Sequence, residues 1–250
     1  MAPSLGRVNS DAVGQVQRHD YSGDGLTEEM LAATPYQQLR RWVDEADERA
    51  LTNPDVYEPR ALSVATVDGH GVPNVRTVLM RFLDERGPGF VSSTDSTKGL
   101  ELAGNAHVAA CLTWPAMFRS VRVRGTVERI VAEEVHDYWV TRPWGSRISA
   151  WASHQSAPAR DRAQLEEDYA RYAAQFPDHG RPDDVPVPET WSGYRVRATE
   201  VEFWAGRSNR LHDRLIFTAV GAGGGVAAQD VAAKPSLDDA AAWVLTRRQP

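Results

Sequence analysis

Hydrophobic residues recur at two different spacings along this 250-residue chain, and the spacing separates predicted helices from predicted strands. Thr34 followed by Pro35 is typical of a helix start, with threonine at the N-cap and proline at the first helical position. Apolar side chains then return every three or four residues as far as Ala50, which predicts a helix that ends before Asn53 and Pro54. The same spacing predicts a second long helix over residues 159–176.

Alternation of apolar and polar residues predicts a series of short strands. The clearest lies at 120–131, where Val121 and Val123 alternate with Arg122 and Arg124. Further strands are expected at 62–67, 75–82, 89–92, 108–114, 194–196, 201–204 and 210–219, with short helices at 97–103 and 132–141. Because tight turns rather than regular helices separate most of these strands, the sequence favours a mainly β fold, an antiparallel barrel with flanking helices.

Two segments depart from this pattern. Residues 1–30 contain few apolar positions and are expected to form a mobile N-terminal arm, which leaves 31–250 as a single domain. Within that domain, the Gly- and Ala-rich stretch at about 220–242 is expected to be a loose insertion.

Composition narrows the function classes. The chain has 28 basic and 34 acidic residues, a net charge of −6, which argues against a general nucleic-acid-binding surface. A single cysteine, Cys111, excludes an intrachain disulfide and a cysteine-based zinc cluster, and no metal site is expected. The sequence lacks an apolar run of about 18 residues and the apolar core of a signal peptide, so we expect no membrane partner and a cytoplasmic location.

Candidate functional side chains are most closely spaced at residues 210–214. In a strand, Arg210, His212 and Arg214 would share one face, and two guanidinium groups beside an imidazole form a face that attracts anions. Taken alone, this pattern is explained more simply by an exposed charged strand.

Several sequence blocks, in order along the chain, resemble those of the pyridoxamine/pyridoxine 5′-phosphate oxidase family. Residues 202–204 (EFW) and 209–214 (NRLHDR) resemble its C-terminal signature. The earlier blocks are RTVLMR at 76–81, STKG at 96–99, RP at 142–143, SRISAWASHQS at 146–156 and WSGYRV at 191–196. With an RxxY pattern at 18–21, the resemblance extends over most of the chain.

The resemblance implies a split β-barrel that works as a homodimer and binds FMN in clefts between subunits. The residues implied to hold FMN are Arg76, Val78, Leu79, Ser92, Lys98, Gln155, Ser156, Trp204 and Arg214. Arg76 and Lys98 fall at the flavin phosphate, a doubly charged group that suits a forked arginine with a lysine point charge.

The resemblance also implies a substrate and a reaction. Arg81, Tyr138, Arg142 and Ser146 are implied to grip the phosphate of a phosphorylated pyridine, with Arg18 and Tyr21 closing over it from the arm and Arg210 and His212 catalytic above the ring. A hydride would leave the C4′ carbon of pyridoxine or pyridoxamine 5′-phosphate for flavin N5, giving pyridoxal 5′-phosphate, and O₂ would reoxidise the flavin to yield H₂O₂.

The chain departs from the family pattern in places that leave alternatives open. Thr97 stands where the family has arginine, Ser120 where it has glutamine, and Arg147 and Ser149 where it has glutamine and glycine. One alternative is a flavin oxidase of specialised metabolism, of the phenazine type, that oxidises a reduced aromatic ring system. Another is a non-catalytic split-barrel protein that stores or senses a flavin or a B6 vitamer.

The phosphate-gripping residues distinguish these alternatives. A substrate without a phosphate would have no use for them, so their presence favours the phosphorylated pyridine. Arg210 and His212 in turn argue against a non-catalytic protein.

Overall fold

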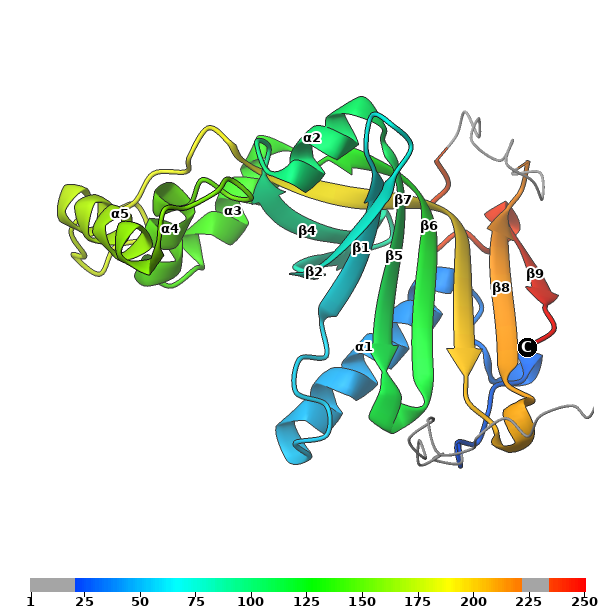
Figure 1. Cartoon of the computed structure of the whole chain (residues 1–250). Helices are drawn as coiled ribbons and strands as arrows, with labels where there is room; N and C mark the ends of the chain where they lie inside the picture. The colour runs from blue at the N-terminus through cyan, green and yellow to red at the C-terminus, as the bar shows by residue number, and fades with distance from the viewer. Residues whose placement is uncertain (1–20, 222–233) are drawn as a thin grey trace, which may run out of the picture.

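One antiparallel sheet forms the body of the protein in a computed structural model that describes residues 21–221 and 234–250 (Figure 1). Its strand order is β2 (Pro73–Leu79), β1 (Ala61–Val67), β5 (His107–Trp114), β6 (Arg119–Arg129), β7 (Trp191–Ala205), β4 (Gly87–Ser93) and β3 (Phe82–Asp84). In addition, β8 (Asp213–Ala219) pairs with β7, and β9 (Trp243–Arg247) pairs with β8. Short 3-10 turns lie at Glu28–Met30, Pro115–Met117, Ser208–Arg210 and Ala240–Ala242.

The sheet divides at β7. Residues 191–195 of this strand pair with β4 and residues 200–205 pair with β8, whereas β6 follows nearly its whole length on the other side. A register shift at Arg124 and Gly125 keeps the two long strands paired, and it needs glycine because a Cβ on Gly125 would lie 1.9 Å from the Arg197 carbonyl oxygen. The predicted mainly β split-barrel architecture is therefore confirmed.

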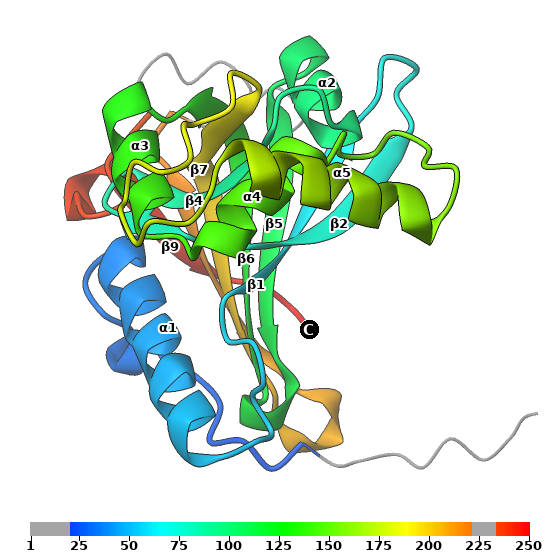
Figure 2. The ribbon, with the colours of Figure 1, turned by 90° about the vertical axis from the view of Figure 1, so that its left-hand side faces the viewer.

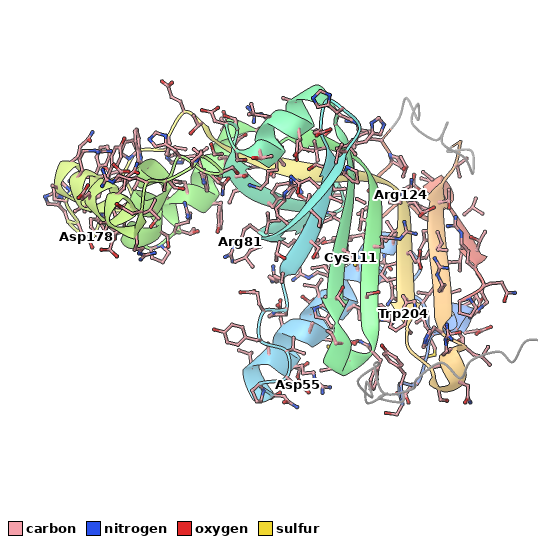
Figure 3. The ribbon with its side chains drawn as sticks, viewed as in Figure 1. Asp55, Arg81, Cys111, Arg124, Asp178 and Trp204 are labelled. Carbon is pink, nitrogen blue, oxygen red and sulfur yellow. The ribbon has the colours of Figure 1, made fainter. Side chains whose placement is uncertain are left out.

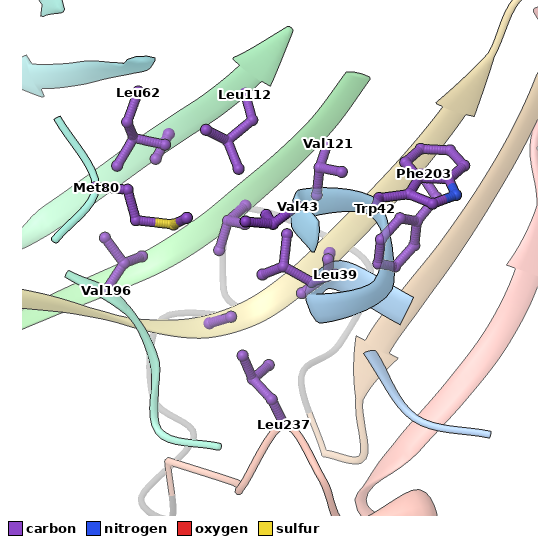
Figure 4. Close-up of a cluster of buried hydrophobic side chains, with 14 of the residues drawn as sticks. Leu39, Trp42, Val43, Leu62, Met80, Leu112, Val121, Val196, Phe203 and Leu237 are labelled. Carbon is purple, nitrogen blue, oxygen red and sulfur yellow. The ribbon is translucent and has the colours of Figure 1, made fainter. Parts of the chain in front are cut away.

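Helix α1 (Pro35–Thr52) packs against the sheet and completes the main core (Figures 2 and 4). Thr34 caps it as predicted, accepting a hydrogen bond from the Gln37 N–H at 3.2 Å. Its apolar face buries Leu39 and Trp42, and Trp42 meets Phe203 of β7 edge to face with 5.4 Å between ring centroids. Burial of each such side chain contributes about 1.5–3 kcal/mol, which fixes α1 on the sheet.

Helices α3 (Ala132–Val140), α4 (Trp144–Ala152) and α5 (Arg162–Gln175) form a lobe beside β4. The lobe has a small core of its own, built on Trp139, Ile148 and Val185. Helix α2 (Thr97–Gly104) lies against the β1–β2 hairpin. In the described part of the chain, no helix combines the length and apolarity that a membrane crossing requires.

Strand boundaries in two regions of the sheet differ from the prediction, in addition to the start of β8. The strand expected at 75–82 breaks after β2, because the chain crosses there toward β4: the Met80 N–H donates to the Arg60 carbonyl at 2.9 Å and the Arg81 N–H to the Gly89 carbonyl at 2.8 Å. The strands expected at 194–196 and 201–204 are parts of one strand, β7. The polar residues between them continue the strand, because their backbone pairs with neighbouring strands.

The two segments expected to be loose are partly packed. Residues 1–20 and 222–233 lie outside the described residues, but Leu26 is 2% exposed and its N–H donates to the buried Asp213 carboxylate at 2.8 Å. Leu237 is fully buried in the main core, and its N–H donates to the Glu85 carbonyl at 2.7 Å. Each is a single apolar residue in a polar or Ala-rich segment. Because neither belongs to a periodic pattern, the sequence did not predict that they are buried.

Candidate active site

A cleft of about 580 Å³ opens between the sheet and the helical lobe. This volume suits a small molecule or a cofactor. Its lining includes many of the predicted site residues, namely Arg76, Val78, Leu79, Arg81, Ser92, Lys98, Tyr138, Arg142, Ser146 and Gln155. Thr77, Val91, Thr141 and Pro143, which were not among the predicted site residues, complete it. We call this the anion cleft, because its described lining contains four cationic side chains and no Asp or Glu.

Lys98 is the most deeply placed of these cations. It lies in the first turn of α2, is 6% exposed, and donates to Ser92 Oγ at 2.9 Å, Gln155 Oε1 at 3.0 Å and Ser96 Oγ at 3.3 Å. All three partners are neutral, and no described carboxylate pairs with it. Burial, followed by the charge of Arg76, lowers the pKa of Lys98 below its ordinary value. A buried ammonium held only by neutral oxygens fits a bound phosphate.

Arg142 is a second cation of the cleft, with Arg81 also in the lining and Arg147 near enough for its charge to act on Arg142. Its guanidinium lies over the rings of Trp139 and Trp191, 5.2 and 5.1 Å from their centroids, and its Nη1 is buried without a hydrogen-bond partner among the described residues. Burial lowers the pKa of Arg142, and the charges of Arg81 and Arg147 lower it further, although Tyr138 acts in the opposite direction. A buried donor without a partner, under the influence of other positive charges, is a strong candidate to bind an anion.

Tyr138 and Ser146 flank Arg142. Tyr138 stacks on Trp191 with 6.1 Å between centroids and meets Phe82 edge to face, which holds its ring at the cleft. Helix α3 ends at Val140, so Arg142 lies just beyond the helix, and Ser146 lies in the first turn of α4. The predicted meeting of these three residues is observed, although a break between two helices produces it and not one helical face.

An ion network around the buried Arg195 fixes the lobe to the sheet. Arg195 of β7 donates to Asp84 at 2.8 Å and to Glu134 of α3 at 3.0 Å, and its side chain is 2% exposed. Arg86 bridges the same two carboxylates. Because Glu134 lies one turn before Tyr138 on α3, this network sets where the Tyr138 and Arg142 side chains reach the cleft.

The remaining predicted residues gather elsewhere. Tyr21, Trp204 and His212 form an aromatic cluster with Phe118, with centroid distances of 4.9 Å between Trp204 and His212 and 5.2 Å between Tyr21 and His212. The Arg207 N–H donates to His212 Nδ1 at 3.0 Å, so the neutral ring carries its proton on Nε2.

The predicted strand face of Arg210, His212 and Arg214 is wrong. Asn209 and Arg210 adopt left-handed conformations, with φ of 57° and 62°, in a 3-10 turn, and β8 begins only at Asp213. Arg210 is therefore exposed on a turn, while Arg214 donates to the buried Glu202 at 2.7 Å. Asparagine tolerates the left-handed region, which is the local reason for the turn.

Within one chain the anion cleft and the aromatic cluster lie far apart. Trp191, which stacks on Tyr138, begins β7, and Trp204 lies near its end, so about 40 Å of strand contour separates them. Figure 3 shows Arg81 and Trp204 on different sides of the molecule.

Of the other predicted residues, Ser156 is exposed beside Gln155 with a φ of 72°, and Arg18 lies outside the described residues. Within residues 21–221 and 234–250, no three His, Cys, Asp or Glu side chains lie close enough together to hold a metal ion.

Sequence comparison connects this arrangement to known proteins. Residues 48–176 match the family model described as pyridoxamine 5′-phosphate oxidase, and residues 191–250 match that of the pyridoxine 5′-phosphate oxidase C-terminal dimerisation region. A pyridoxine/pyridoxamine 5′-phosphate oxidase from Kineococcus radiotolerans is 43% identical over 234 residues, which are 94% of this chain and 97% of that protein. One from Streptomyces avermitilis is 43% identical over 202 residues, 81% of this chain and 88% of that protein.

Structural comparison finds the same architecture. PhzG from Burkholderia lata, solved in complex with tetrahydrophenazine-1-carboxylic acid, has a TM-score of 0.73 and 28% identity, covering 92% of this chain and all of that one. An FMN-binding protein from Nostoc punctiforme, related to pyridoxamine 5′-phosphate oxidase, has a TM-score of 0.59 at 16% identity, covering 84% and 97%, and shares the fold.

Proposed function

Because the chain belongs to the pyridoxamine 5′-phosphate oxidase family, we propose that it is an FMN-dependent oxidase that converts pyridoxine or pyridoxamine 5′-phosphate to pyridoxal 5′-phosphate with O₂, releasing H₂O₂. The main support is that the anion cleft holds two cations, Lys98 and Arg142, that have no acidic partner among the described residues. Burial lowers the pKa of both, and the cations beside them differ, Arg76 for Lys98 and Arg81 with Arg147 for Arg142, so they belong to separate groups. Two cationic groups match two phosphates, one on the cofactor and one on the substrate.

In this proposal Lys98 and Arg76 hold the FMN phosphate. Ser92 and Gln155 fix the Lys98 ammonium by accepting its hydrogen bonds, and Ser92 also donates to Gln155 at 2.8 Å. Val78 and Leu79 supply apolar lining beside Arg76. Ser156 directly follows Gln155, and we assign it to the same cofactor group. Bound FMN would supply the hydride acceptor and the reaction with O₂.

Arg142, Tyr138, Ser146 and Arg81 then bind the substrate phosphate. An anchor of this kind holds the ground state and the transition state equally, so its removal raises KM more than it lowers kcat. The charge-assisted bond is worth about 1.5–3 kcal/mol, or about 10- to 150-fold.

The aromatic cluster comes to this site from a second copy of the chain. The match of residues 191–250 to a dimerisation region supports a homodimer, and the length of β7 keeps Trp204 and His212 away from their own anion cleft. In the partner's cleft, His212 and Arg210 would orient the pyridine ring, Trp204 and Arg214 would adjoin the flavin, and Tyr21 and Arg18 would close the site. The lone Cys111 suits a reducing compartment, and we place the enzyme in the cytoplasm on that ground.

Substrate and cofactor are tested together. The released cofactor should have the mass of FMN and not of FAD, and the protein should oxidise pyridoxine 5′-phosphate in air faster than unphosphorylated pyridoxine, with H₂O₂ formed. Oxidation of a reduced phenazine carboxylate in the absence of activity on pyridoxine 5′-phosphate would establish the phenazine-type alternative, which the PhzG likeness supports at lower identity than the B6 oxidases. A flavin-free protein without turnover would contradict both.

Complementation tests the shared site. Arg142→Ala and His212→Ala chains, differently tagged and co-expressed, give mixed dimers that tandem purification isolates. If each site takes Arg142 from one chain and His212 from the other, a mixed dimer keeps one intact site of two and about half of the wild-type activity. If both residues act within one chain, the mixed dimer is as inactive as its parents.

A further inference from the structure

Glu101 lies behind the cofactor end of the anion cleft, on α2 and three residues after Lys98. Its side chain is 7% exposed, and both oxygens accept hydrogen bonds. Oε1 accepts from Asn74 Nδ2 at 3.0 Å, and Oε2 accepts from Arg76 Nη2 at 2.8 Å and from the Thr66 hydroxyl. One carboxylate therefore ties α2, which carries Lys98, to the β1–β2 hairpin, which carries Arg76.

The contacts of Glu101 also orient Arg76. Arg76 Nη1 donates to the Val64 carbonyl at 3.2 Å and to the Thr66 hydroxyl oxygen, which in turn donates to Glu101. Three of the five N–H bonds of the guanidinium are then in use. The N–H on Nε and the second N–H on Nη2 remain for a ligand, and because three acceptors fix the plane of the group, both keep a fixed direction.

Glu101 changes the charge as well as the geometry. Burial raises the pKa of its carboxyl, but the hydrogen bonds from Asn74, Thr66 and Arg76 outweigh burial, and the pKa lies below its ordinary value. The group is therefore ionised at neutral pH. With Arg76 and Lys98 it leaves a net charge of one positive where the two cations alone would give two. Thr97, in the position where the resembling family has arginine, adds no charge to offset it.

We propose that Glu101 is a positioning residue that sets the cofactor affinity of the anion cleft: it fixes Arg76 for the phosphate, and its negative charge limits how tightly that phosphate is held. The proposal rests on the proposed function, in that the phosphate is that of FMN. Geometry and charge act in opposite directions on affinity, so two substitutions separate them.

Glu101→Gln removes the charge and keeps an oxygen that accepts from Arg76. Apoprotein carrying it should bind FMN about three- to tenfold more tightly than wild type at low ionic strength, because one unfavourable carboxylate–phosphate interaction is lost. The gain should shrink at 0.5 M salt, at which charges are screened beyond about 4 Å. Thr66→Val keeps the shape and the charge but removes the hydroxyl that links Arg76 to Glu101, and should weaken FMN binding about three- to tenfold.

Titration of apoprotein into FMN, followed by quenching of flavin fluorescence, measures both dissociation constants without turnover. Glu133→Gln, which removes an exposed charge from the first turn of α3, is the matched control and should bind FMN as wild type does. Unchanged or weaker binding by Glu101→Gln, or unchanged binding by Thr66→Val, would overturn the inference and leave the proposed function intact. Failure of wild type to bind FMN would overturn both.

Discussion

Replacing Arg142 with methionine should remove substrate binding at little cost to the fold. The buried Nη1 has no described partner, and an unsatisfied donor of this kind destabilises a protein by about 1–3 kcal/mol. The contacts of the guanidinium with Trp139 and Trp191 each stabilise the folded protein by about 0.5–1 kcal/mol. Methionine fills a similar volume against both rings, so the free energy of unfolding should change by less than about 2 kcal/mol.

Two measurements follow from this balance. Urea unfolding of the apoprotein gives the stability change, and steady-state oxidation of pyridoxine 5′-phosphate gives KM, which should rise about 10- to 150-fold with kcat changed far less. Stability reduced by more than 3 kcal/mol, or an unaltered KM, would refute the assignment of Arg142 to a ligand.

Arg195→Met is the matched control. Arg195 is equally an arginine beside the lobe, but its buried side chain donates to Asp84 and Glu134, so its removal breaks two charge-assisted hydrogen bonds, while Arg86 still pairs with both carboxylates. Each of these bonds contributes about 1.5–3 kcal/mol, so Arg195→Met should destabilise the fold more than Arg142→Met does. The two substitutions remove the same group, and the contrast between them isolates the arginine that lacks an acidic partner.

Three further outcomes are expected. FMN affinity should be full below the lowered pKa of Lys98 in the free protein and fall as pH rises through it, because phosphate binds the ammonium form; Lys98→Arg should abolish this pH dependence, measured by flavin fluorescence. Gly99→Ala should lower the thermal midpoint and cofactor content together, since its Cβ would lie 2.3 Å from the Thr94 carbonyl oxygen and displace the turn that carries Lys98. Arg210→Ala should lower kcat and leave FMN content unchanged, because in the proposed site Arg210 orients the ring and does not hold the cofactor.

The sequence correctly predicted the elements that depend on interactions between neighbouring residues. The Thr34 cap, the alternation of Val121 and Val123 in β6 and the end of α1 follow from neighbouring residues and are confirmed. The family and the split-barrel architecture are also confirmed, by the family models and the PhzG likeness. Both predictions came from the order of several motifs along the chain. No single motif would have been sufficient to identify the family or the fold.

Features that depend on distant contacts were not predictable in this way. Glu101 has the sequence context of a helix-surface residue and is buried only because α2 docks on the β1–β2 hairpin. Arg147, in a position where the family has glutamine, is buried because the Arg181 and Pro182 carbonyls accept from it. The alternation at 210–214 predicted a strand, but the left-handed turn at Asn209 interrupts it.

In the proposed site, the placement of β7 calls for a second copy of the chain. The same strand supplies Trp191 to the support of the anion cleft and Trp204 to the aromatic cluster, and its hydrogen bonds to β6 keep it extended between them. A strand cannot shorten without losing these bonds, so no rearrangement that preserves the sheet brings His212 to Arg142 of its own chain. In the proposed homodimer the two halves of the site meet across an interface, and affinity for substrate should therefore depend on dimerisation even though every phosphate-binding residue belongs to one chain.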